Sequence, residues 1–336
     1  MKYGAGRVFA CAMAIVSAMA ASPAVAWNDT GHLAIAMAAY DALPQDVRVR
    51  LDAVVGAFPR FRADFVAPSP DWVEDAPAAS QRRWYFAFAS TWPDRARRFA
   101  HVRDAGERAA LVRRYDRPTW HYVNLPTYLA PADRRTLALP SPPLVANEST
   151  RDANLNIVQA LERLERDWRN AATDAERALA LVWIAHLVAD LHQPLHATAL
   201  YAVGVLEKGD RGGNLIAVGS RDNLHGIWDA ALGSGRRQQD LDRARTALKT
   251  ATVAAPAAID FAAWARESRT VADRYVYTAG LRTSLEAQRR SAGRLEVAID
   301  ARYRDAMRAL ARERGALAAV RLAAVLTALS RGAASR

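Results

Sequence analysis

Apolar residues recur along this chain mainly at the spacing of α-helices. The clearest case is residues 174–203, where apolar side chains cover most of the circumference of a predicted long helix. A helix that is apolar nearly all round lies buried in a protein core. Pro194 should end or kink this helix, because proline lacks a backbone N–H. Narrower apolar stripes predict further helices at residues 32–43, 47–55, 154–169 and 295–329.

Three irregular stretches interrupt the helical pattern. Residues 123–150 are rich in proline, residues 204–224 are rich in glycine and leave room for a small hairpin, and residues 58–80 form a third loop. Loops of this length in a compact domain are usually functional or mobile. Strand signals are few, so we expect an all-α fold, a single mostly helical domain over residues 27–336 with long loops around an active-site cleft.

The first 26 residues have the features of a secretory signal peptide. Lys2 and Arg7 precede an apolar run over residues 8–21, and small residues at 24–26 suit signal peptidase. The run is too short to cross a bilayer, although a membrane anchor or a retained N-terminal helix is the alternative. We therefore expect cleavage after Ala26 and export to the periplasm or the medium, with no membrane span in the rest of the chain.

Composition narrows the chemistry that the mature chain can perform. Cys11 is the single cysteine and lies in the predicted leader, which excludes cysteine catalysis and cysteine-rich zinc sites. The formal net charge is +11. A basic protein favours anionic partners such as nucleic acid or phospholipid headgroups, but arginines spread along the whole chain are also typical of a solvated surface. The charge therefore does not decide the partner.

Histidine and aspartate residues fall at spacings that suit metal binding. His186 and Asp190 are four residues apart and share one face of the predicted buried helix. Asp190 has no Lys or Arg within a helical turn, and a buried carboxylate needs a cation or a metal ion. His225 and Asp229 repeat the spacing, with His196 between the two pairs. A lone histidine is usually a satisfied core residue, but this combination is a suitable zinc ligand set.

The candidate ligands outnumber those of one zinc ion. A catalytic zinc takes about three protein ligands and keeps a position for water, so eight side chains suit two or three ions. The eight are His32, Asp94, His121, His186, Asp190, His196, His225 and Asp229. His101 and His192 are expected to be ordinary surface or structural residues.

Six short motifs resemble those of a known family. In chain order they are WNDTGH, ASTWPD, WHYVNLP, HLVADLHQPLH, GDRGGN and NLHGIWD. Together they are similar to the three-zinc, single-strand-specific secreted nucleases of the mung-bean-nuclease type, which are related to zinc-dependent phospholipase C. The resemblance runs from Trp27 to at least Asp229. It implies a mostly helical fold of the phospholipase C/nuclease type and hydrolysis of RNA and single-stranded DNA to 5′-phosphorylated products, often with 3′-nucleotidase activity.

The resemblance also implies how three zinc ions would be held. One ion would take Asp94, His121 and His186. A second would take His196, His225 and Asp229. A third would take His32 with the free amine and carbonyl oxygen of Trp27, and Asp190 would bridge the first and third ions. Because the nitrogen of Trp27 is an amide in the precursor, cleavage after Ala26 would create this ligand.

Four further residues match substrate-site positions of the family. Arg97 would grip the phosphoryl group with its always-charged guanidinium. Tyr122 would stack on a base, with Asn124 beside it, and Asn214 would lie near the site. Several fungal members have a carboxylate where this chain has Asn124. Without the resemblance, Arg97 would be a solvated arginine and Tyr122 a core or rim tyrosine.

These expectations give a mechanism and leave two alternatives. The metal pair bridged by Asp190 would activate the attacking water, and the zinc at His196 would stabilise the leaving 3′ oxygen. The expected partners are single-stranded DNA, RNA and 3′-nucleotides, with no stable protein partner implied. The alternatives are a phospholipase C-like phosphodiesterase acting on lipid headgroups and a zinc-binding protein without turnover. The HYVN and GDRGGN segments favour the nuclease.

Overall fold

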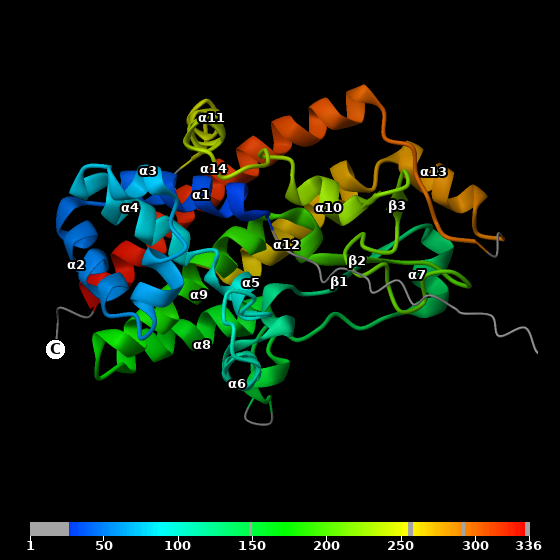
Figure 1. The fold of residues 1–336 in the computed structure, drawn as a ribbon. Helices are drawn as coiled ribbons and strands as arrows, with labels where there is room; N and C mark the ends of the chain where they lie inside the picture. The colour runs from blue at the N-terminus through cyan, green and yellow to red at the C-terminus, as the bar shows by residue number, and fades with distance from the viewer. Residues whose placement is uncertain (1–26, 148–149, 255–257, 291–292, 333–336) are drawn as a thin grey trace, which may run out of the picture.

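Helices dominate the part of the chain that is described in the computed structural model, which covers residues 27–147, 150–254, 258–290 and 293–332. The strands in these ranges form two small two-stranded sheets (Figure 1). The predicted all-α, mostly helical fold is therefore confirmed. The predicted signal peptide over residues 1–26 lies outside the described residues, so its cleavage stays a prediction.

Helix α9, Asp174–His192, is the central buried helix that the apolar pattern predicts. From Ala178 to its end almost every residue is buried, and α8 (Ile157–Asn170) and α14 (Ala301–Gly332) pack against it. The prediction that the helix runs on to residue 203 is wrong. Pro194 ends it at His192, and the chain continues through the 3₁₀ turn η4 (Pro194–His196) into strand β2 (Thr198–Tyr201).

The four amphipathic stripes each form a helix. They correspond to α1 (Asp29–Ala42), α2 (Gln45–Gly56), α8 and α14. The last helix begins at Ala301 and not at residue 295. The backbone of Ala217 donates to the carbonyl of Leu295 at 2.8 Å and accepts from the N–H of Val297 at 2.9 Å, which holds that stretch extended.

The long loops contain short elements that apolar periodicity does not reveal. Residues 58–80 hold the π-helix η1 (Arg62–Val66) and α3 (Asp71–Glu74). Residues 123–150 hold β1 (Leu125–Tyr128), which pairs in parallel with β2, and α7 (Pro131–Leu137). The glycine-rich stretch contains the predicted small hairpin, an antiparallel pair of β3 (Ala217–Val218) and β4 (Asp222–Asn223).

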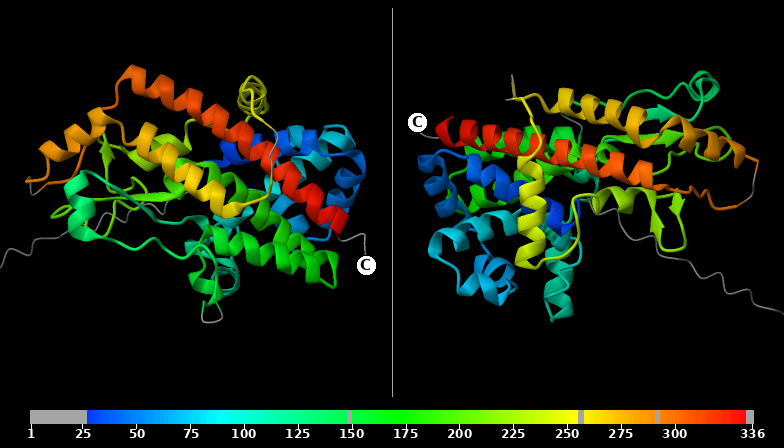
Figure 2. Two further views of the ribbon diagram at one scale, coloured as in Figure 1. Left: turned by 180° about the vertical axis from the view of Figure 1, so that it is seen from behind. Right: turned by 90° about the horizontal axis from the view of Figure 1, so that it is seen from above.

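The remaining elements complete the arrangement around α9. They are α4 (Ala78–Ala89), α5 (Trp92–Ala96), α6 (Ala105–Tyr115), η2 (Pro118–His121), η3 (Asp152–Asn154), α10 (Leu224–Asp229), α11 (Gln238–Lys249), α12 (Phe261–Val271), η5 (Ala272–Val276) and α13 (Ala279–Ala287). Figure 2 shows α14 running along the length of the molecule, from the end near α13 to the end near α2.

One described helix, α14, is long and apolar enough to cross a membrane by length and composition. Half of its most apolar window is buried inside the protein. It also packs against α1, α9 and α11, as expected for the core helix of a globular fold. A buried core helix passes this test as readily as a membrane span does, so the finding is weak support for a span.

Candidate metal centre

The eight predicted ligand side chains come from six elements that converge beside the C-terminal half of α9. His32 lies in the first turn of α1 and Asp94 lies on α5. The α9 residues His186 and Asp190 lie between these two side chains in space. The ends of η2 and η4 and the short helix α10 contribute the rest, which are His121, His196, His225 and Asp229. Seven of the eight are buried, and the side chain of Asp94 is 8% exposed.

These side chains form three groups. Within each group the potential ligand atoms lie within 4.8 Å of one another. The groups are His32–His186–Asp190, Asp94–His121–His186 and His196–His225–Asp229. Each group could hold a metal ion. The structure therefore brings together all eight side chains that the sequence singled out. Two groups have the members that the resemblance implies, whereas the group at His32 contains His186 with Asp190 and does not include Trp27. The assignment of ligands to individual ions stays a prediction.

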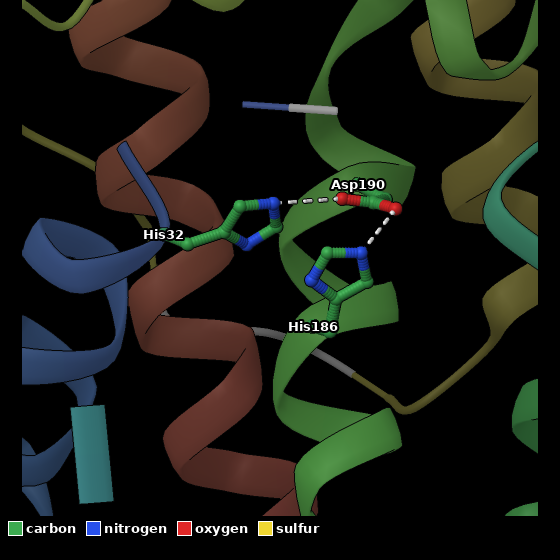
Figure 3. Close-up of side chains that lie close together, drawn as sticks. All are labelled: His32, His186 and Asp190. Atoms are coloured by element: carbon green, nitrogen blue, oxygen red, sulfur yellow. Dashed lines mark ion pairs between the residues drawn. The ribbon is translucent and has the colours of Figure 1, made fainter. Parts of the chain in front are cut away.

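Asp190 lies at the meeting point of the first two groups. Its Oδ1 is 3.2 Å from Nε2 of His32, and its Oδ2 is 3.2 Å from Nε2 of His186 and 3.2 Å from Nδ1 of His121. Figure 3 shows the two carboxylate oxygens turned towards different imidazoles. The rings of His32 and His186 stack with their centroids 4.1 Å apart. A carboxylate placed in this way can bridge two cations.

Backbone carbonyls fix the tautomers of three histidines. Nδ1 of His186 is 2.8 Å from the oxygen of Ser90, and Nδ1 of His196 is 2.6 Å from the oxygen of His121. Nδ1 of His225 is 2.6 Å from the oxygen of Gly212. Because a carbonyl can only accept, each Nδ1 carries the proton, and Nε2 presents a lone pair whenever the ring is neutral.

In the His196–His225–Asp229 group the two imidazoles face each other with their lone pairs. Nε2 of His196 lies 3.2 Å from Nε2 of His225, which lies 3.3 Å from Oδ2 of Asp229. Two lone pairs at this distance repel unless a cation lies between them. Burial lowers the pKa of His196, which disfavours a proton as that cation. A metal ion fits the donor set.

Buried polar atoms without hydrogen-bond partners also gather in the first two groups. They include Nδ1 and Nε2 of His32, Oδ1 of Asp94, Nε2 of His121 and Oδ1 of Asp190. The 3.2 Å approach of His32 to Asp190 brings the atoms close without the geometry of a hydrogen bond. Buried polar atoms are rarely left unpaired, because each such atom costs free energy. Their concentration here fits cation binding.

Burial favours the neutral imidazole of a metal ligand at His32 and His121. Burial lowers the pKa of His121 to about 4, and it also lowers the pKa of His32, so both rings are neutral near pH 7. Burial alone would raise the pKa of Asp190, but the attraction of His186 and the hydrogen bond with His121 hold it well below its ordinary value. Burial raises the pKa of Asp229 well above its ordinary value, so its ionised form needs a compensating cation.

Trp27 is held between α9 and α10, next to the first group. Its ring is fully buried, and its indole N–H donates to the carbonyl of Ala189 at 3.0 Å. The next residue, Asn28, donates its backbone N–H to the carbonyl of Asp229 at 3.1 Å and caps α1 through its side chain. Trp27 therefore has a fixed position beside the residue that precedes Asp190.

Gln193 is a functional candidate that the sequence reasoning missed. Its side chain is fully buried and donates from Nε2 to Oδ1 of Asp229 at 2.6 Å, while its Oε1 accepts from the N–H of Leu195 at 2.6 Å. This leaves Oδ2 of Asp229 facing His225. No periodicity in the sequence reveals the pairing, because the two partners are 36 residues apart.

The other histidines have structural partners. Nδ1 of His192 lies 2.7 Å from the carbonyl oxygen of Val188, and its Nε2 lies 2.9 Å from the guanidinium of Arg321. His101 lies 2.9 Å from the buried carboxylate of Asp64. Both belong to packing networks outside the three groups, as expected.

Three of the four predicted substrate residues lie on or next to segments that carry ligands, and Asn214 lies in the glycine-rich loop. Nε of Arg97 is 3.7 Å from Oδ1 of Asp94, and its side chain is 10% exposed. Tyr122 and Asn124 are half-buried and directly follow η2. Asn214 is half-buried and donates to the carbonyl of Arg211 within the glycine-rich loop. Their contact with a substrate stays a prediction.

The comparison with protein families agrees with this geometry. The model of the S1/P1 nuclease family matches residues 27–331, nearly the whole chain. A search of curated proteins found no match. The family predicted from the six motifs is thereby confirmed.

Proposed function

We propose that this chain, which belongs to the S1/P1 nuclease family, is a zinc-dependent endonuclease. It would hydrolyse single-stranded DNA and RNA to 5′-phosphorylated products and act on 3′-nucleotides. The observation that carries the proposal is the buried convergence of three His/Asp groups on the carboxylate of Asp190 and the facing imidazoles of His196 and His225.

The proposed ligand assignment follows these groups. One zinc would be held by Asp94, His121 and His186, and a second by His196, His225 and Asp229. A third would be held by His32 and by the amine and carbonyl oxygen of Trp27, with Asp190 shared between the first and third. Neutral imidazoles with carboxylates and no thiolate are a donor set that zinc accepts. When bound, zinc would lower the pKa of a coordinated water and neutralise phosphate charge.

Arg97 is proposed to hold the scissile phosphoryl group. Its guanidinium lies beside the carboxylate of Asp94, so an anion bound at that group would come within its reach. A planar guanidinium can donate two parallel hydrogen bonds to phosphate oxygens and remains charged at any physiological pH. Asp94 in turn keeps the arginine close to the reaction centre.

Tyr122, Asn124 and Asn214 are proposed to bind the base. The half-buried ring of Tyr122 offers an aromatic face next to His121, and aromatic faces bind unpaired bases by stacking. The amide groups of Asn124 and Asn214 can both donate to and accept from base edges. A base that is stacked and paired in a duplex has no free face for Tyr122, which gives a preference for single strands.

Residues 1–26 are proposed to direct export to the periplasm or the medium, and their removal is proposed to complete the site. The fixed position of Trp27 beside Ala189, and the bond of the next residue, Asn28, to Asp229, support this. Trp27 lies two residues before α1 begins, and His32 is in the first turn of that helix. An uncleaved chain would carry an amide nitrogen there, and an amide is a poor metal ligand.

The test is an assay of purified mature protein with single-stranded DNA, RNA, duplex DNA and phosphatidylcholine vesicles. Each substrate is tested untreated, after chelation, and after zinc is added back. We expect single-stranded substrates to be cleaved fastest, with activity lost on chelation and restored by zinc. His196→Ala should be inactive, whereas the matched His101→Ala should keep its activity. Cleavage that survives complete chelation would contradict the zinc mechanism, and turnover of phosphatidylcholine without turnover of nucleic acid would replace the substrate.

A further inference from the structure

A further buried carboxylate, that of Asp210, lies near the His196–His225–Asp229 group. Asp210 belongs to the GDRGGN loop between β2 and β3 and is fully buried. Among the described residues it is bonded by neutral donors, not by a Lys or Arg. A buried carboxylate without a cationic partner is expensive, so its retention calls for an explanation.

Four neutral donors surround this carboxylate. The hydroxyl of Tyr277 donates to Oδ2 at 2.6 Å, and the N–H of Leu200 donates to Oδ1 at 2.9 Å. The backbone N–H groups of Gly212 and Gly213 also stabilise its ionised form. Burial raises the pKa of Asp210 to about 6, and these four bonds oppose that rise. The carboxylate therefore fastens its own loop to β2 and to the end of η5.

The loop can close around Asp210 because its backbone is left-handed. Arg211, Gly212 and Gly213 have φ angles of 57°, 61° and 84°. A Cβ on Gly212 would lie 2.5 Å from the carbonyl oxygen of Leu195, so a side chain at that position would displace the loop. The loop is thus pressed against the residue that precedes His196.

The same loop reaches the metal centre through one hydrogen bond. The carbonyl of Gly212 accepts from Nδ1 of His225 at 2.6 Å, and it shares a peptide group with the N–H of Gly213, which stabilises the Asp210 carboxylate. That bond selects the tautomer whose Nε2 lone pair faces His196 and Asp229. One peptide group therefore separates the buried carboxylate from a predicted ligand.

We propose that Asp210 and Tyr277 are positioning residues for the His196–His225–Asp229 group. The carboxylate folds the loop around itself, Tyr277 locks the carboxylate, and the Gly212 carbonyl then fixes the ring orientation and tautomer of His225. The inference rests on the proposed function, since it takes this group to hold a metal ion.

The test compares zinc binding by Asp210→Asn and Tyr277→Phe with that of the wild-type chain. Asp210→Asn replaces an acceptor oxygen by a donor that cannot satisfy the loop N–H groups, while Tyr277→Phe removes a single donor. We expect about 10- to 100-fold weaker zinc binding at one of the sites in Asp210→Asn, measured by chelator competition, and a smaller loss in Tyr277→Phe.

A second readout does not depend on metal. Nitrogen-15 NMR of the metal-free proteins reports which ring nitrogen of His225 carries the proton. We expect the Nδ1–H tautomer in the wild-type chain and a shift towards Nε2–H in Asp210→Asn. If Asp210→Asn fails to fold, Tyr277→Phe, which keeps the carboxylate, decides by the same two measurements.

The matched control is Asp133→Asn. Asp133 is also a buried carboxylate and accepts backbone N–H groups from Ala130 and Val203 at 2.9 Å each, but it lies on α7 and contacts none of the ligands. This variant should lose stability and keep its zinc affinity and the His225 tautomer. If Asp210→Asn and Tyr277→Phe both keep the wild-type zinc affinity and the wild-type tautomer of His225, the inference is overturned and the proposed function stays intact. Unchanged zinc stoichiometry in His225→Ala would overturn the proposed site itself, and the inference with it.

Discussion

Gln193→Glu is expected to weaken metal binding at the His196–His225–Asp229 group without disturbing the fold around it. In the wild-type chain the amide of Gln193 donates to Asp229 at 2.6 Å and accepts from Leu195 at 2.6 Å. Glutamate has the same shape and keeps the acceptor, but it places a second oxygen against the carboxylate of Asp229. The substitution therefore removes a donor and adds repulsion.

The size of the effect follows from the bond that is lost. A hydrogen bond to a charged group contributes about 1.5–3 kcal/mol, and about 1.4 kcal/mol corresponds to a tenfold change in affinity. Zinc binding at this group should therefore weaken by about 10- to 100-fold, with the remaining sites unchanged. Activity should fall at limiting zinc and recover in part when zinc is raised.

Chelator competition measures this change directly, and Gln159→Glu is the matched control. Gln159 is buried on α8 and donates to the carbonyls of Pro143 and Val145, away from the ligands. Its substitution should lower stability and leave zinc affinity unchanged. The reasoning is refuted if Gln193→Glu binds zinc as tightly as the wild-type chain, or if the control weakens binding equally.

Three further predictions test other parts of the site. One extra residue before Trp27 should lower the zinc content from three to two ions and abolish most activity. The nitrogen of Trp27 would then be an amide, and the buried indole prevents Trp27 from shifting to bring the new amine into its place. Three ions with full activity would disprove the ligand role of the amine. Because burial lowers the pKa of His121 to about 4, its ring stays neutral above that pH and gains a proton as the pH falls through it. Zinc should therefore be retained at pH 5 and released near pH 3, and undiminished zinc at pH 3 would contradict the ligand set. Arg97→Lys should lower kcat by about 100-fold through loss of the two-point phosphate grip, whereas Arg98→Lys, at an exposed neighbour, should match the wild-type enzyme in the same steady-state assay.

The part of the site carried by a single helix could be predicted from the sequence. His186 and Asp190 share a face of α9 because four residues make about one turn, and the apolar surroundings indicate that the face is buried. Asp94 and His121 lie on separate elements, so their approach to α9 depends on tertiary packing. The order of motifs placed them in the site through the family resemblance, which spacing could not do.

The residues that position the ligands were beyond the reach of the sequence. Gln193 meets Asp229 across 36 residues, and Asp210 meets Tyr277 across 67. Side-chain pairs so far apart leave no periodic signal. The path of the chain after α9 could not be predicted for a different reason. Pro194 predicts a break in the helix. Only the pairing of β2 with β1, 73 residues earlier, determines that the chain continues as a strand.

The central claim is that the three His/Asp groups around Asp190 hold zinc and that this zinc supports cleavage of single-stranded nucleic acid. The most direct measurement is the zinc-to-protein ratio of the purified mature chain, taken on the same samples whose cleavage of single-stranded DNA is followed during stepwise chelation. We expect three zinc ions per chain and a loss of cleavage that tracks their removal. Full cleavage by protein stripped of zinc would contradict the claim.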